Sequence, residues 1–162
     1  LKDSAIKEQV VSDAGAGRRA EAPLAFWMSN IDHFKSVNDR LGNMLGDHVI
    51  KTLARLVQQR LRASDSIGRY GGEEFAVILP HCDLQLAREI MDQIRTLFSE
   101  MRFTHEGEIF SVTFISGLAT WPEHADAGSL NRAADEALYA AKRGGRNRIE
   151  IAGAGNAQGT SN

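Results

Sequence analysis

Two adjacent carboxylates stand at the tip of a predicted hairpin, within the stretch GRYGGEEF over residues 68–75. Gly71 and Gly72 suit the tight turn and also allow a ligand to approach the backbone closely. Glu73 and Glu74 are like charges at neighbouring positions, and the turn itself does not require them. The pair fits either a solvated hairpin end or a site for a hard divalent cation such as Mg²⁺, which prefers carboxylate oxygens and bridges substrate phosphates.

A second polar segment, over residues 29–39, follows directly on a continuous apolar run at 24–28. Polar groups at the end of a buried central strand are well placed to face a ligand. Asp32 and Asp39, taken alone, are more typical of residues that form turns.

Asn38 and Asp47 suit the recognition of guanine. A carboxylate can accept two N–H bonds from the Watson–Crick edge of this base, and an asparagine adds one donor and one acceptor. Such paired contacts reject other bases, because an unmatched buried polar group is costly. Asp47 is equally suited to cap the helix that is predicted to follow it.

Lys142 and Arg146 place two cations near the end of the last predicted helix. Cations there complement the helix dipole and Gly144 is a suitable C-terminal cap, so a structural role explains them well. The same two side chains also suit a clamp for a triphosphate, because charged hydrogen bonds to phosphate oxygens are strong.

Strands and helices alternate along the chain around these groups. The spacing of apolar residues predicts strands over 24–28, 66–70, 75–79, 109–120 and 149–151, and helices over 47–60, 83–98 and 129–142. This order, β-α-β-β-α-β-α-β, predicts an α/β (α+β) fold with a ferredoxin-like mixed sheet, a central hairpin and helices packed around it.

The 162 residues are 43% hydrophobic with a net charge of −2, which fits one globular domain and gives no sign of binding to nucleic acid or a membrane surface. Cys82 is the single cysteine, so no disulfide within the chain is possible, as in proteins of a reducing cytoplasm. We expect a helix and linker over residues 1–22, the main domain over 23–152 and a disordered tail over 153–162.

Together and in this order, these stretches resemble the GGDEF domain, the catalytic domain of diguanylate cyclases. The resemblance runs from about residue 23 to 151 and rests on IDHFK at 31–35, ND at 38–39, GD at 46–47, RYGGEEF at 69–75, ADEALYAAK at 134–142 and GRN at 145–147. It implies a nucleotide-cyclase-like sheet and an enzyme that condenses two GTP into cyclic di-GMP across a homodimer, with release of two pyrophosphates. It also implies Mg²⁺ or Mn²⁺ as cofactor, and a cytoplasmic location, as a separate domain or within a larger, membrane-anchored protein.

The resemblance also assigns roles to the residues that the pattern left open. Glu73 and Glu74 would hold the metal ion and help to remove the 3′-hydroxyl proton, and the Ile31 carbonyl and Asn30 would complete the metal shell. The implied substrate-binding residues are Asn38 and Asp47 for guanine, Phe34 and His33 for the pocket walls, Gly71 and Gly72 for the α-phosphate, and Lys142 and Arg146 for the β- and γ-phosphates.

Arg62 and Asp65 match the spacing of the RxxD site through which this family is inhibited by its product. By resemblance, they would bind cyclic di-GMP and hold the domain in a non-productive arrangement, since a guanidinium pairs with phosphate and a carboxylate accepts from guanine N–H groups. A surface ion pair is the structural alternative. Gln93 stands where the family often has an arginine that assists this site from a second molecule.

Asn30 is the main departure from the family pattern, because members usually carry a metal-binding aspartate at this position. Asparagine keeps a carbonyl oxygen but loses the charge, which lowers its affinity for Mg²⁺. The sequence therefore predicts a diguanylate cyclase and leaves a second function open, that of a weakened domain that binds GTP or cyclic di-GMP as a receptor.

Overall fold

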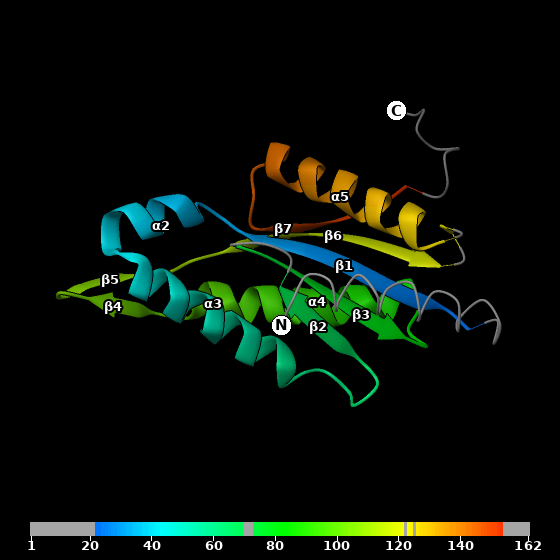
Figure 1. Cartoon of the computed structure of the whole chain (residues 1–162), viewed down its shortest axis with the longest axis horizontal. Coiled ribbons are helices and arrows are strands. Elements are labelled where there is room, and N and C mark those ends of the chain that lie inside the picture. Colours follow the sequence, from blue (N-terminus) through cyan, green and yellow to red (C-terminus); the bar gives the residue numbers. More distant parts are fainter. Residues whose placement is uncertain (1–21, 70–72, 122, 125, 154–162) are drawn as a thin grey trace.

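Strand β1 (Leu24–Ile31) occupies the middle of a five-stranded sheet in the order β2-β3-β1-β6-β7 (Figure 1). It pairs antiparallel with β3 (Glu74–Pro80) on one side and with β6 (Phe114–Trp121) on the other. At the edges, β2 (Ser66–Arg69) is antiparallel to β3, and β7 (Arg148–Ile151) is parallel to β6. The predicted mixed sheet is therefore confirmed.

This computed structural model describes residues 22–69, 73–121, 123–124 and 126–153. The helix expected in the N-terminal segment, the turn at Gly71 and Gly72, and nearly all of the expected tail lie outside the described residues. Within the described part of the chain, no helix combines the length and the apolar character needed to cross a membrane.

Helices cover both faces of the sheet (Figure 1). Helix α5 (Ala127–Arg143) lies on one face, and α3 (Asn43–Gln58) and α4 (Leu84–Glu100) lie on the other. Successive side chains of β1 point to opposite faces of the sheet. Phe26 packs in the apolar cluster under α5, and Trp27 packs in the cluster under α3 and α4. Both aromatic side chains are fully buried, so β1 is held between two cores.

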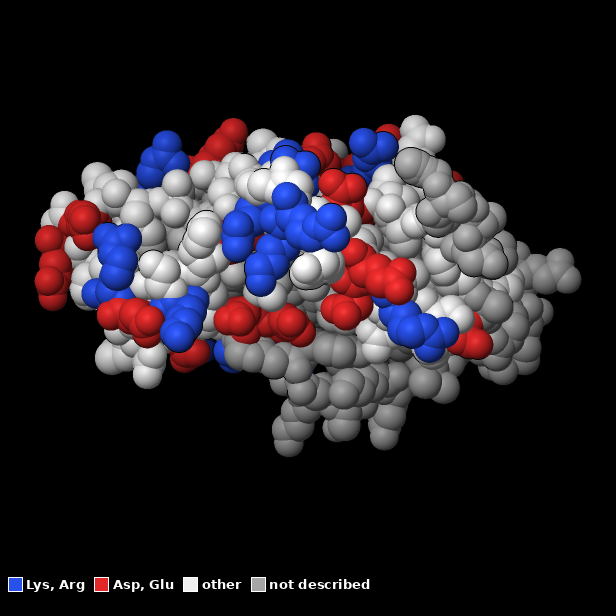
Figure 2. Space-filling model, turned by 90° about the horizontal axis from the view of Figure 1, so that it is seen from above, with Lys and Arg blue, Asp and Glu red and all other residues white. Residues whose placement is uncertain are grey.

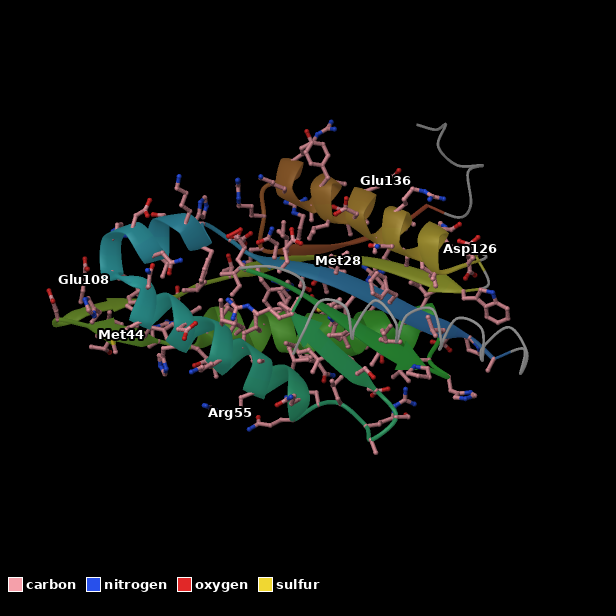
Figure 3. All side chains as sticks on the ribbon, viewed as in Figure 1. Met28, Met44, Arg55, Glu108, Asp126 and Glu136 are labelled. Carbon is pink, nitrogen blue, oxygen red and sulfur yellow. The ribbon has the colours of Figure 1, made fainter. Side chains whose placement is uncertain are left out.

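Side-chain caps determine where two of these helices begin. Asp83 accepts a hydrogen bond from a first-turn amide of α4, and Asp126, labelled in Figure 3, does the same for α5. Strand β6 approaches α5 so closely that a Cβ atom at Gly117 would lie 2.1 Å from the Ala134 carbonyl oxygen. This contact fixes the distance between α5 and the sheet.

Helix α2 (Phe34–Leu41) occupies part of the polar segment at 29–39 and was not among the predicted helices. Its apolar residues Phe34, Val37 and Leu41 follow helical spacing, but the helix has only eight residues and Phe34 alone is buried, so the short pattern was missed. Helix α3 begins at Asn43 after the cap residue Gly42, so the alternative role of Asp47 as a helix cap is wrong.

The single strand expected over 109–120 is also wrong. Strands β4 (Phe103–His105) and β5 (Glu108–Phe110) form a separate hairpin, and β6 begins only at Phe114. Glu106 and Gly107 both have positive φ, 50° and 82°, which is the conformation of a two-residue hairpin turn. The prediction failed because β-forming residues continue through the break between β5 and β6.

Candidate active site

A cavity of about 190 Å³ lies where β1 ends. Asn30 and Ile31 contribute to its wall from β1, Glu73 from the residue before β3, and Lys142 and Arg146 from the end of α5 and the loop after it. Three segments that are far apart in the sequence thus place amide, carboxylate and cationic groups around one space.

A larger hollow of about 550 Å³ lies between α2 and the β4–β5 hairpin, at the end of the molecule where Glu108 is labelled in Figure 3. Arg40 and Glu108 form an exposed ion pair there, at 3.7 Å. Among the described residues that line this hollow, none was predicted to carry chemistry, so the smaller cavity is the candidate site.

Asn30 lies opposite Glu74 in the antiparallel pairing of β1 with β3. Directly opposed residues of two strands project from the same face of the sheet, with Cβ atoms about 5 Å apart. The Ile31 amide donates a hydrogen bond of 3.3 Å to the Glu73 carbonyl oxygen, which ties the start of β3 to the end of β1. Both glutamates therefore lie beside the two residues that were predicted to complete a metal shell.

These groups form an oxygen-rich set that fits a hard divalent cation. Glu73 and Glu74 offer carboxylates, while the Asn30 side chain and the Ile31 backbone offer neutral oxygens, and Mg²⁺ and Mn²⁺ prefer oxygen ligands. Within the described residues, no three His, Cys, Asp or Glu side chains gather as a metal cluster. The set thus carries two negative charges, one fewer than an aspartate at position 30 would give.

Asn38, Gly46 and Phe34 are in contact where α2 meets α3. A Cβ atom at Gly46 would lie 1.7 Å from Asn38 Oδ1 and 3.2 Å from the Phe34 ring, so glycine leaves room for both side chains. Asn38 Oδ1 is buried and has no hydrogen-bond partner among the described residues. Asp47 has a half-exposed side chain, 3.9 Å from Lys51. Of the two residues predicted to bind guanine, Asn38 thus touches Gly46 and Asp47 follows Gly46 in the chain. Phe34 belongs to the same contact and also lines the cavity.

His33 and Lys35 also line the cavity. His33 has a φ of 55°, in the left-handed region, at the point where the chain turns from β1 into α2. Lys35 was given no role from the sequence, because a lone lysine in a polar segment carries little signal. Seen from the α5 side, Figure 2 shows basic side chains gathered over the C-terminal end of α5, the region of Lys142.

Arg62 and Asp65 bind each other. The guanidinium makes two hydrogen bonds to the carboxylate, of 2.8 and 3.1 Å, and one of 2.6 Å to the Pro80 carbonyl oxygen. The hydrogen bond to Asp65 raises the pKa of Arg62, and burial raises the pKa of the nearby Cys82 thiol to about 11. The Asp65 side chain is 2% exposed and that of Arg62 is 47% exposed, so a ligand at this site first meets the arginine.

A family model and solved structures show the family and the fold of this chain. The family model described as "Diguanylate cyclase, GGDEF domain" matches residues 4–148. This chain belongs to the GGDEF family. The family membership and the mixed α/β fold that were predicted from the sequence are both confirmed.

Similar GGDEF proteins come from several bacteria. Diguanylate cyclase DgcP of Pseudomonas aeruginosa is 36% identical over 149 residues, which are 92% of this chain and 22% of that protein. Diguanylate cyclase A of Treponema denticola is 32% identical over 147 residues, which are 90% of this chain and 39% of that protein. This GGDEF chain therefore spans well under half the length of these two relatives.

Solved GGDEF structures match nearly the whole chain. The active GGEEF domain of a diguanylate cyclase from Vibrio cholerae matches with a TM-score of 0.88 and 31% identity, over 94% of this chain and 97% of that one. The GGDEF domain of DgcB from Caulobacter crescentus, in complex with c-di-GMP, matches with a TM-score of 0.88 and 30% identity, over 92% of this chain and 89% of that one.

The Asn30–Glu74 pairing predicts how Asn30→Asp changes metal binding. The variant should bind Mn²⁺ about tenfold more tightly, a gain of about 1.4 kcal/mol, because a third carboxylate joins the set. Without metal it should unfold at a lower temperature than the parent, since like charges directly opposite on two strands repel. Calorimetric titration with Mn²⁺ and thermal unfolding in EDTA measure the two effects. Asn30→Ala is the control and should show neither the tighter Mn²⁺ binding nor the charge repulsion. Equal Mn²⁺ affinity in Asn30→Asp and the parent would contradict the assignment.

Proposed function

We propose that this GGDEF domain is a diguanylate cyclase, which joins two GTP molecules into cyclic di-GMP and releases two pyrophosphates. The observation that carries the proposal is that one cavity at the end of β1 has Glu73 on one part of its wall and Lys142 and Arg146 on another. Phosphoryl transfer depends mainly on positioning and on neutralising charge, and this cavity offers both acidic and basic groups for that purpose.

Residues in the cavity and next to it bind different parts of the nucleotide. Lys142 and Arg146 bind the β- and γ-phosphates, while Asn38 and Asp47 hold guanine beyond Phe34. Glu73 and Glu74 hold a divalent cation and accept the proton of the attacking 3′-hydroxyl. A bound Mg²⁺ ion neutralises negative charge on the phosphates.

Two copies of the domain must meet for each product molecule. Each GTP supplies a 3′-hydroxyl that attacks the α-phosphate of the other, so the two cavities face one another across a homodimer. Gly71 and Gly72, which lie outside the described residues, are assigned to the α-phosphate from their residue type, because glycine allows a ligand to approach the backbone closely. The rate per domain therefore rises with protein concentration wherever the domain is mostly monomeric.

A second candidate is a weakened domain that binds GTP or cyclic di-GMP as a receptor. The observation in its favour is Asn30, which leaves the oxygen set with two carboxylates beside the Ile31 carbonyl. The exposed Arg62 side chain, which is held by Asp65, also favours this candidate, because it offers a group that can bind cyclic di-GMP without catalysis.

Incubation with GTP separates the two candidates. The purified domain, at a series of concentrations with Mg²⁺ or Mn²⁺, should form cyclic di-GMP and pyrophosphate in a 1:2 ratio, with a rate per domain that rises with concentration. Chromatography and a pyrophosphate assay measure the products. Absence of product at every concentration, together with binding of GTP or cyclic di-GMP, would establish the receptor instead.

Gly46→Ala should weaken GTP binding about tenfold, about 1.4 kcal/mol, and lower the preference for GTP over ATP. The added methyl group overlaps the end of the Asn38 side chain, which can rotate away and leave the fold intact. Gly128→Ala in α5 is a matched control, because its Cβ atom would make ordinary contacts of 3.5 Å or more. GTP and ATP affinities from titration, with melting temperatures, test this, and unchanged GTP affinity in Gly46→Ala would refute the guanine assignment.

Arg62→Ala should weaken binding of cyclic di-GMP at least tenfold and leave GTP affinity unchanged, because Arg62 carries the exposed cation of the RxxD pair. Product inhibition of the cyclase should decrease in parallel. Arg55→Ala, an exposed arginine of α3 labelled in Figure 3, is the control for loss of one positive charge. Calorimetric titration gives both affinities, and an Arg62→Ala variant with the parent's affinity for cyclic di-GMP would rule out this site.

A further inference from the structure

The loop between α5 and β7 holds two consecutive non-glycine residues in the left-handed region. Arg146 has a φ of 65° and Asn147 a φ of 44°. Such conformations are uncommon for residues other than glycine and persist only where the surroundings determine them. Arg146 lines the candidate active site. The contacts that hold this loop therefore also fix the backbone position from which the Arg146 side chain extends.

A buried carboxylate holds the loop from one side. The backbone N–H of Asn147 donates a hydrogen bond of 3.0 Å to Asp32 Oδ2, and the Thr113 hydroxyl donates one of 2.6 Å to the same oxygen. Asp32 is 6% exposed and follows directly on β1. Because one buried oxygen of Asp32 accepts both hydrogen bonds, this side chain joins the end of β1, the entry to β6 and the loop.

An arginine of α4 holds the loop from the other side. Arg95 Nη1 donates a hydrogen bond of 2.9 Å to Asn147 Oδ1 and a longer one of 3.4 Å to the Asn147 carbonyl oxygen. The opposite edge of the guanidinium is bound to Asp92, with an Nε–Oδ1 distance of 3.0 Å and an Nη2–Oδ1 distance of 2.9 Å. Asp32 thus holds the backbone N–H of Asn147, and Arg95 holds its side chain.

We propose that Asp32, Asn147 and Arg95 are positioning residues that hold Arg146 ready for the phosphates of GTP. The inference rests on the proposed function of the cavity and concerns how that site is built. A cation that is already in place loses little freedom when the nucleotide binds, whereas a free loop would have to be ordered first. Asn147 and Arg95 act through Arg146, so their effect is confined to ligands that carry the distal phosphates.

The test compares ligands with and without those phosphates on the full chain. Arg95→Ala should weaken binding of 3′-deoxy-GTP, which lacks the attacking hydroxyl, about tenfold and leave binding of 3′-deoxy-GMP within twofold of the parent. Arg95→Lys, which keeps one donor, should recover part of the loss. Arg88→Ala removes an exposed arginine from the same helix and should bind both ligands as the parent does.

Two further variants separate positioning from general damage to the fold. Asn147→Gly removes the side-chain acceptor of the shorter Arg95 hydrogen bond, keeps the backbone carbonyl and tolerates positive φ, and it should reproduce most of the loss seen in Arg95→Ala. In an Arg146→Ala background, Arg95→Ala should cause no additional loss beyond twofold, because the group that it positions is already absent.

Each outcome bears on one proposal or on both. Equal affinity for 3′-deoxy-GTP in Arg95→Ala and the parent would overturn the positioning role and leave the proposed function standing. Equal losses for the two ligands, or an undiminished loss in the Arg146→Ala background, would also overturn it. A parent that binds neither 3′-deoxy-GTP nor pyrophosphate would overturn both proposals.

Discussion

The pairing of β1 with β3 on one side and β6 on the other is the constraint on which the site depends. Because β1 is bonded along both edges and buried on both faces, its register is fixed, and that register puts Asn30 opposite Glu74. A slip of one residue would move every side chain of β1 to the other face. The place of the polar groups is therefore determined by the burial of Phe26 and Trp27 in two separate cores.

Opposite charges share the cavity that this register creates. Glu73 and the cations Lys142 and Arg146 line the same 190 Å³, although they come from opposite sides of the sheet order. Such a wall suits a ligand that itself carries both signs, as a metal–triphosphate complex does. Separate segments bring the charges together, so no single stretch of the sequence contains the site.

The long, strongly periodic elements could be predicted from the sequence, and both α4 and α5 lie within two residues of their expected bounds. The motif residues at the end of β1 and at the end of α5 also meet as expected. Short elements escaped: α2 buries Phe34 alone, and the β4–β5 turn is hidden among β-forming residues. Asp32 does lie in a turn, as its residue type predicted, but its hydrogen bonds to Thr113 and Asn147 could not be predicted, because these partners are 81 and 115 residues away.

Strand β1 precedes both of its partner strands in the chain, and this order has a consequence for biosynthesis. Its apolar residues leave the ribosome before either partner strand: β6, which covers the second edge, ends only at Trp121, and the loop that binds Asp32 follows later still. At typical synthesis rates this interval is on the order of ten seconds. During that time an unpaired apolar strand is open to association with other chains. The nascent domain is therefore most open to such association before β6 and the helix and strand that follow it emerge.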